Sequence, residues 1–183
     1  LLDCCLVTDA GGAVVLTSME RARDLKQHPV AVLGFGESID HAMISQMHDF
    51  TAGPARVSGK LAFDMAGVRR DDIDLAMLYD SFTYTVLMTL EDLGFCKKGE
   101  GGPFVSNQRT APGGEFPLNT NGGGLSYTHP GMYGVFTLIE STRQLRHDYQ
   151  DQGLRQVPDA KLAVAHGTGG VLSSAGTVIL GRA

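Results

Sequence analysis

The spacing of apolar residues along the chain changes several times between a helical and a strand-like period. Helical spacing predicts three amphipathic helices, over residues 54–67, 80–94 and 131–147. In the first of these, Val57, Leu61 and Met65 fall on one face, and Gly67 stands where a helix commonly ends. In the second, Asp80 and Ser81 are residue types that cap helix N-termini. These segments therefore supply the helical layers of the fold.

Strand-like patterns separate the helices. Short apolar or alternating runs predict strands over residues 11–18, 28–38, 72–79, 160–170 and 173–182. The last two strands flank a glycine turn, which predicts a hairpin. A short helix is predicted over residues 19–25, and an irregular segment over residues 103–116. Strands that alternate with helices and close on a hairpin indicate an α/β fold with a mixed, mostly buried sheet.

Composition narrows the class of protein. The chain of 183 residues is 43% hydrophobic and 19% charged, with a net charge of −5. Its Lys and Arg residues are scattered, so neither nucleic acid nor an anionic membrane is an expected partner. No apolar run approaches the roughly 20 residues of a membrane span. Three cysteines without metal-ligand spacing predict a reduced, cytoplasmic protein with no metal site.

Three positions combine reactive side chains with strand ends or loops. Tyr79 ends a predicted strand and is followed at once by a predicted helix, a junction where α/β proteins commonly place reacting groups. His129 follows the glycine run 122–124 and precedes a helix, and His166 ends a strand at the turn "HGTGG". We expect the three positions to converge on one pocket.

Several motifs resemble those of the thiolase family, in the family's order. The stretch "NTNGGGLSYTHPGMYG" (119–134) resembles its "N-x-x-G-G…H-P" motif, "YDSF" (79–82) stands where thiolases carry "NEAF" or "HDCF", and "HGTGG" (166–170) resembles a terminal strand turn. The opening residues are similar to the segment that closes the N-terminal half of that fold. The resemblance implies the C-terminal half of a thiolase-like α/β fold, a mixed five-stranded-type sheet covered by helices. It assigns residues 1–27 to the end of the N-terminal half and residues 28–183 to the C-terminal domain.

The chain departs from the family at the residues that would carry thiolase chemistry. Ser81 stands at the position of the cysteine in "HDCF", His166 stands in the terminal turn, and Tyr79 replaces the Asn or His that polarises the thioester. A serine hydroxyl cannot replace a thiol as acid and base at neutral pH. Claisen condensation is therefore disfavoured.

The sequence most resembles the thiolase-like lipid-transfer-protein aldolases of bacterial steroid side-chain degradation. This resemblance implies retro-aldol cleavage of a steroid 3-hydroxyacyl-CoA to propionyl-CoA and a 17-ketosteroid, with coenzyme A as part of the substrate and no separate cofactor. Such cleavage needs a base for the β-hydroxyl proton and donors for the thioester enolate. We expect Tyr84 and Tyr133 to be the acid/base pair, with His129 as relay and Tyr79 as alternative oxyanion donor. The expected substrate-binding residues are Tyr127, Ser81, His166, Gly123, Gly124 and Gly169.

The resemblance also implies a homodimer and a small partner protein with an OB-fold and a zinc ribbon. Other interpretations stay open at this stage. The chain could be a thiolase-type acyltransferase with rearranged acid/base groups, or a non-catalytic subunit that binds lipid or acyl-CoA. A tyrosine on a helix can equally be a core residue, Ser81 can be a helix cap, and His166 can orient a turn.

Overall fold

The computed structural model describes residues 3–183. Four strands form one mixed sheet in the order β1-β4-β3-β2, and their bounds are β1 Val30–Ile39, β2 Leu75–Leu78, β3 Leu162–Gly169 and β4 Ser174–Arg182. The hairpin strands β3 and β4 pair antiparallel, β1 pairs antiparallel with β4, and β2 pairs parallel with β3. Beyond β2, a parallel bridge between Ala76 and Leu118 occupies the place of a fifth strand.

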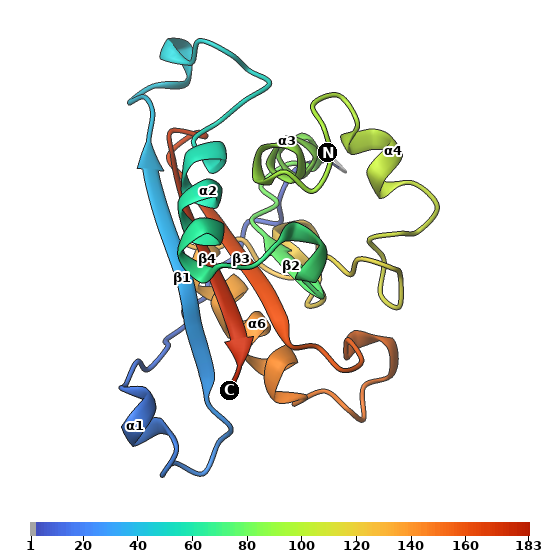
Figure 1. Ribbon diagram of the computed structural model, residues 1–183. Coiled ribbons are helices and arrows are strands. Elements are labelled where there is room, and N and C mark those ends of the chain that lie inside the picture. Colours follow the sequence, from blue (N-terminus) through green and yellow to red (C-terminus); the bar gives the residue numbers. More distant parts are fainter. Residues whose placement is uncertain (1–2) are drawn as a thin grey trace.

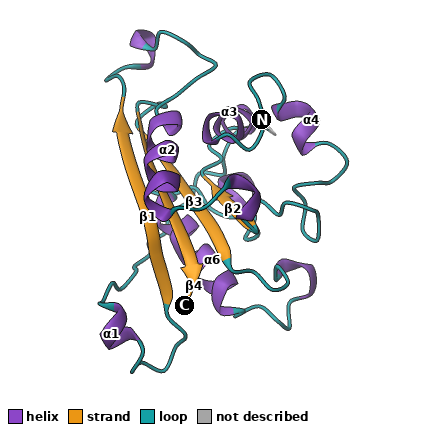
Figure 2. Ribbon diagram, viewed as in Figure 1, coloured by secondary structure: helices purple, strands orange, loops and turns teal. Residues whose placement is uncertain are grey.

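Helices cover both faces of this sheet (Figures 1 and 2). The main helices are α2 Ala55–Ala66, α3 Thr83–Leu93 and α6 Gly134–Arg146, with α1 Met19–Ala22, α4 Gly101–Val105 and α5 Gly123–Ser126 as short additions. One-turn 3-10 helices lie at Ile44–Gln46, Arg70–Asp72 and Gly153–Arg155. Helices α2 and α3 cover one face and α6 covers the other, so the molecule has three layers. No helix in residues 3–183 has the length and apolar character needed to cross a bilayer.

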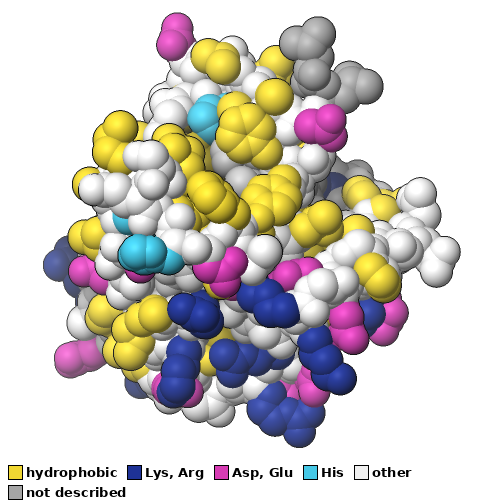
Figure 3. Space-filling view, turned by 90° about the horizontal axis from the view of Figure 1, so that it is seen from above, with side chains coloured by type: hydrophobic (Ala, Val, Ile, Leu, Met, Phe, Trp, Pro, Cys, Tyr) yellow, Lys and Arg dark blue, Asp and Glu magenta, His cyan; other side chains and the backbone are white. Residues whose placement is uncertain are grey.

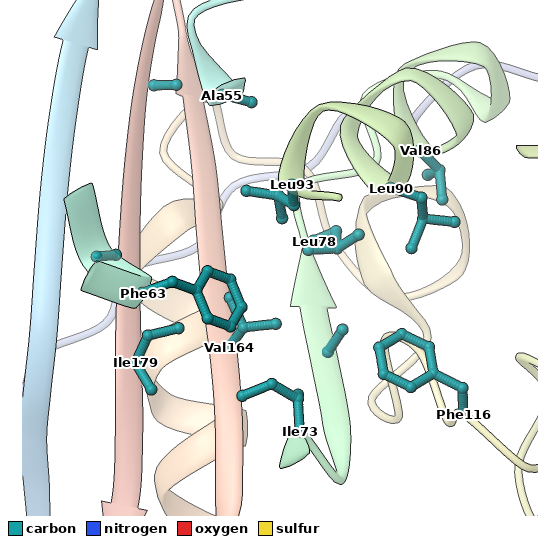
Figure 4. Close-up of a cluster of buried hydrophobic side chains, with 13 residues drawn as sticks. Ala55, Phe63, Ile73, Leu78, Val86, Leu90, Leu93, Phe116, Val164 and Ile179 are labelled. Atoms are coloured by element: carbon teal, nitrogen blue, oxygen red, sulfur yellow. The ribbon is translucent and has the colours of Figure 1, made fainter. Parts of the chain in front are cut away.

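Two clusters of buried side chains lie on the two faces of the sheet. The larger one joins α2 and α3 to the sheet through Phe63, Leu90, Leu93, Val164 and Ile179 (Figure 4). On the opposite face, α6 packs on residues such as Met77 and Leu180. Because side chains alternate along a strand, successive β2 residues contribute to opposite clusters. Leu75 and Met77 thus face α6, whereas Ala76 and Leu78 face α2 and α3.

The three main predicted helices and the terminal hairpin are confirmed, with ends that differ by up to three residues. The predicted strand over residues 11–18 is wrong. In this segment Val15 is 93% exposed and Leu16 81% exposed, with no strand beside them in the described residues. Part of the irregular segment predicted over 103–116 is helical, because α4 extends to Val105. The expected five-stranded sheet has four strands, and its fifth position is reduced to the bridge at Leu118.

Candidate active site

The candidate site lies at the carboxyl-terminal end of β2, where the chain enters α3. The side chain of Asn119 fixes this end, because its Oδ1 accepts the N–H of Leu78 and its Nδ2 donates to the carbonyl of the same residue, both at 2.8 Å. Tyr79 follows Leu78, and α3 begins after the N-cap residue Phe82. Asp80 and Ser81 thus form a short connection between strand and helix, and neither is the N-cap residue.

The carboxylate of Asp80 holds the glycine run against this connection. Asp80 is 3% exposed, and its two oxygens accept the N–H groups of Gly124 at 2.6 Å and Leu125 at 3.3 Å. Gly123 has a φ of +68°, and a Cβ at this position would lie 2.1 Å from Asp80 Oδ2. The closeness of the carboxylate, together with the left-handed backbone, explains why the chain carries glycine here.

Tyr79 and His129 form a direct pair. The Tyr79 hydroxyl lies 2.5 Å from His129 Nε2, a distance at which the phenol O–H can donate to this nitrogen when the nitrogen carries no hydrogen. The histidine backbone is held as well, since its N–H donates to Thr8 Oγ1 at 3.1 Å. Burial, followed by the charges of Cys5 and Asp80, raises the pKa of Tyr79. The free phenol is therefore a weak acid that needs an acceptor such as His129 to lose its proton.

Tyr133 lies beside this pair but faces a different partner. It is completely buried, its ring centroid is 5.7 Å from that of Tyr79, and it stacks on Phe136 of α6. Its hydroxyl donates to Asn121 Oδ1 at 2.8 Å, and the same oxygen accepts the N–H of Gly123. Burial, and then the charge of Asp80, raises the pKa of Tyr133 well above its usual range. Tyr133 is therefore a protonated donor at neutral pH.

The first described residues of the chain run along the edge of the site. The N–H of Cys5 donates to the Ser81 carbonyl at 2.9 Å, and the N–H of Leu6 donates to the Gly124 carbonyl at 2.8 Å. Further along, Val7 forms a bridge with His129. Residues 3–8 thus connect the strand–helix junction to the loop that carries the histidine. They also bring a half-buried thiol, that of Cys5, near Tyr79.

The side chains of two predicted site residues lie away from this pair. Tyr84 is half exposed on α3, and its hydroxyl donates to the carbonyl of Phe50 instead of meeting Tyr79 or His129. His166 is fully buried on the α2 face of the sheet, where Nδ1 lies 2.9 Å from the Thr177 hydroxyl, whereas Tyr79 packs on the α6 face. The His166 carbonyl accepts the N–H of Tyr79 at 3.0 Å, but the structure does not bring the side chain of Tyr84 or of His166 to the Tyr79–His129 pair.

The other expected substrate-binding residues are divided between the site and its surroundings. Ser81 lies at the junction, with its hydroxyl 3.5 Å from that of Thr85, and Tyr127 packs edge-on against Phe136. Gly169 ends β3 at the hairpin, where a Cβ would meet the Ser174 hydroxyl at 2.4 Å. Their contact with a substrate stays a prediction. In the view from above, hydrophobic side chains cover much of this end of the molecule, with Lys and Arg gathered along one side (Figure 3).

Sequence reasoning missed the polar residues that hold the site together. It treated Asp80 only as a helix cap and gave no role to Asn119, Asn121 or Thr8. Asn119 and Asn121 lie inside the glycine motif, and Asp80 lies inside "YDSF", so motif position alone could have suggested them. Thr8 and His129 are 121 positions apart, so no local sequence pattern could predict their contact.

The geometry allows proton transfer at one point and hydrogen-bond donation beside it. Tyr79 and His129 can pass a proton between oxygen and nitrogen, because their atoms are already within hydrogen-bonding distance. Tyr133, kept protonated, suits the stabilisation of negative charge instead. No group of three or more His, Cys, Asp or Glu side chains in residues 3–183 is placed to hold a metal ion.

Comparison with known proteins gives matches along most of the chain. Over 153 residues it is 40% identical to 17-hydroxy-3-oxo-4-pregnene-20-carboxyl-CoA lyase of Mycobacterium tuberculosis, which covers 80% of this chain and 39% of that protein. It is 34% identical over 184 residues to acetyl-CoA acetyltransferase of Methanothermobacter thermautotrophicus, covering 100% of this chain and 47% of that one. The structure titled "Ltp2-ChsH2(DUF35) aldolase" superposes with a TM-score of 0.87 at 31% identity, again covering 100% and 47%.

The chain thus spans less than half the length of the curated relatives named above. Within that span, the family model described as thiolase C-terminal domain-like matches residues 36–182, which include every strand of the sheet except the start of β1. The sheet of mixed strands between helical layers and the motif residues at the end of β2 agree with this match. The chain belongs to the family of thiolase C-terminal domain-like proteins.

Proposed function

We propose that the protein takes part in retro-aldol cleavage of a steroid 3-hydroxyacyl-CoA, giving a ketone and a shortened acyl-CoA such as propionyl-CoA. The observation that carries the proposal is the Tyr79–His129 pair, which supplies a proton acceptor where a thiolase would need a thiol. The 40% identity to a steroid carboxyl-CoA lyase and the superposition on an aldolase structure support the same reaction class.

In the proposed reaction, Tyr79 accepts the proton of the substrate β-hydroxyl while its own proton passes to His129 Nε2. The bond between the α and β carbons then breaks, the β carbon becomes a ketone, and the electron pair moves into the thioester enolate. The proton held on His129 Nε2 then returns through Tyr79 to the α carbon, which completes the acyl-CoA and restores the pair. Burial keeps Tyr133 protonated, so we assign it to the donor side, near the charge that develops on the enolate.

This assignment differs from the roles expected from the sequence. Tyr79 changes from oxyanion donor to base, and Tyr133 changes from a member of the acid/base pair to a donor. Tyr79 becomes the base through its contact with His129, and Tyr84 is retained only as a residue to be tested, because its hydroxyl is bound to Phe50. The raised pKa of Tyr79 agrees with such a relay, since direct loss of the phenol proton to water is costly near pH 7.

The test is a cleavage assay with the full-length gene product and a steroid 3-hydroxyacyl-CoA, followed by mass spectrometry for propionyl-CoA. Removal of a general base typically costs about 10²–10⁴-fold in rate. We expect such a loss in Tyr79→Phe and in His129→Ala, a smaller loss in Tyr133→Phe, and the least in Tyr84→Phe. Full activity in Tyr79→Phe would overturn the relay.

We further propose that cleavage requires a small partner protein with an OB-fold and a zinc ribbon, and that the full-length chain forms a homodimer. The structural relative carries two names in its title, Ltp2 and ChsH2(DUF35), which supports an assembly. Three free cysteines support a reducing, cytoplasmic location. Co-expression with the candidate partner, followed by size-exclusion chromatography and zinc analysis, tests the assembly.

A second candidate is a thiolase-type acyltransferase. It is favoured by the 34% identity to acetyl-CoA acetyltransferase over the whole chain and by the Cys5 thiol near Tyr79. The two functions separate in one assay, because an acyltransferase consumes a 3-ketoacyl-CoA together with free CoA, whereas an aldolase consumes the 3-hydroxyacyl-CoA alone.

A further inference from the structure

Asp80 is a buried acid that the proposed reaction does not use. It is 3% exposed, and its carboxylate accepts the main-chain N–H groups of Gly124 and Leu125. Within residues 3–183, no lysine, arginine or histidine nitrogen lies within 4.0 Å of it. Burying a charge without a cationic partner is costly. The buried Asp80 carboxylate is therefore not explained by a contribution to folding stability.

The same carboxylate lies near both halves of the proton-transfer pair. Asp80 directly follows Tyr79 along the chain. On the other side, a Cβ at Gly124 would lie 3.2 Å from Asp80 Oδ1 and 3.4 Å from His129 Cδ2. A side chain at residue 124 would thus contact both the carboxylate and the imidazole ring. We therefore expect a side chain added at Gly124 to press on both Asp80 and the histidine.

We propose that Asp80 is the positioning residue that sets the separation of Tyr79 and His129, by binding the backbone of the loop before the histidine to the strand end that carries the tyrosine. This inference rests on the proposed function only for the catalytic role of the Tyr79–His129 pair. The two glycines after Gly122 are then a requirement of Asp80, because larger residues would push the loop away from the carboxylate.

Asp80 also acts on the pair through its charge. The titratable groups around it are Tyr79 at the end of β2, Tyr133 before α6 and His129 in the loop, with Cys5 on the N-terminal segment beyond Tyr79. The negative charge adds to burial in raising the pKa of both tyrosines. Neutralising Asp80 therefore removes one contribution that keeps the phenols protonated, and the phenol-dependent limb of a pH profile moves to lower pH.

The experiment compares Asp80→Asn with Asp92→Asn in the full-length protein. Asp92 serves as a control for the loss of a buried carboxylate charge away from the site. It accepts a backbone N–H from Gly53 at 2.7 Å, is paired with Lys98 at 2.5 Å, unlike Asp80, and makes no hydrogen bond with Tyr79 or His129. We expect kcat to fall about 100-fold in Asp80→Asn with KM little changed, since a misplacement of about 1 Å can cost this much. The alkaline limb of kcat/KM shifts to lower pH in this variant and stays in place in Asp92→Asn.

Gly124→Ala is a second variant that keeps the carboxylate and adds one methyl group between Asp80 and His129. We expect it to lower kcat in the same direction. The ¹⁵N chemical shift of His129 Nε2 reports the tyrosine contact without turnover, and we expect it to change in both Asp80→Asn and Gly124→Ala. If the wild type cleaves no substrate, the proposed function fails while the nitrogen shift still tests Asp80. An unchanged shift and an unchanged pH profile in folded Asp80→Asn would overturn the positioning role.

Discussion

Acid should destabilise this protein through His166. The imidazole is fully buried on the α2 face, Nδ1 contacts the Thr177 hydroxyl, and Nε2 has no partner in the described residues. Burial lowers the pKa of His166 to about 4, whereas an exposed histidine titrates near 6.5. Between these values the unfolded chain binds a proton that the folded chain excludes. The stability associated with the neutral ring is complete above about pH 6.5 and is lost as the pH falls towards 4.

The size of the effect follows from the two pKa values. At pH 5 the unfolded histidine is almost fully protonated and the folded one is mostly neutral, so unfolding is favoured by about 2 kcal/mol relative to pH 7.5. This is a large share of a typical stability of roughly 5–15 kcal/mol. Urea unfolding of the wild type and of His166→Gln at pH 7.5 and pH 5 measures it. We expect the variant to lose about 2 kcal/mol less than the wild type on acidification.

His48→Gln serves as the control for the replacement of a histidine, because His48 is exposed. If His166→Gln and the wild type lose the same stability between pH 7.5 and pH 5, the imidazole is not excluded from protonation in the folded state. The assignment of His166 to a sealed interior position would then be wrong, and a place near substrate would become tenable again.

Three further predictions concern packing and buried hydrogen bonds. Gly123→Ala should destabilise the protein by about 2 kcal/mol or more, because the new methyl group meets the Asp80 carboxylate and the backbone is left-handed; Asp80→Ala in the same chain should restore part of this loss in thermal unfolding. Glu140→Gln should cost roughly 1–3 kcal/mol in urea unfolding, since the buried carboxylate accepts hydrogen bonds from Thr120, Tyr149 and Arg155; an unchanged midpoint would refute this. Leu90→Ala should cost about 2–5 kcal/mol by creating a cavity in the larger cluster, with a calorimetric transition as the measure.

Much of the fold could be predicted from the sequence, because the main helices and the hairpin carry strong periodic patterns. The strand predicted over residues 11–18 shows the limit of this reasoning. Periodicity describes what a segment would bury in the presence of a partner, and Val15 and Leu16 have none in the described residues. Helix α5 shows the opposite limit. It begins with glycines that disfavour helix, and the Asp80 carboxylate supplies the hydrogen bonds that intrinsic propensity does not.

The candidate site could be predicted only in part. Placing Tyr79 and His129 together follows from motif order and strand-end position. The side-chain partners of the tyrosines do not follow, because the partner of a phenol depends on a rotamer and on neighbours distant in sequence. Tyr84 and Tyr133 occupy similar places near the start of a helix, yet one reaches the carbonyl of the exposed Phe50 and the other reaches the partly buried Asn121.

The order of strands in the sheet affects how the protein is made. Of the four strands in this sheet, β1 is synthesised first, and its partner is β4, which is synthesised last, with Val30 opposite Arg182. Contacts between residues so far apart close a long loop of chain and form slowly. During translation, β1 therefore lacks its β4 partner, and its apolar residues stay unpaired until the intervening residues have been added. Nascent chains halted before β4 should consequently be the species most prone to aggregate or to engage chaperones.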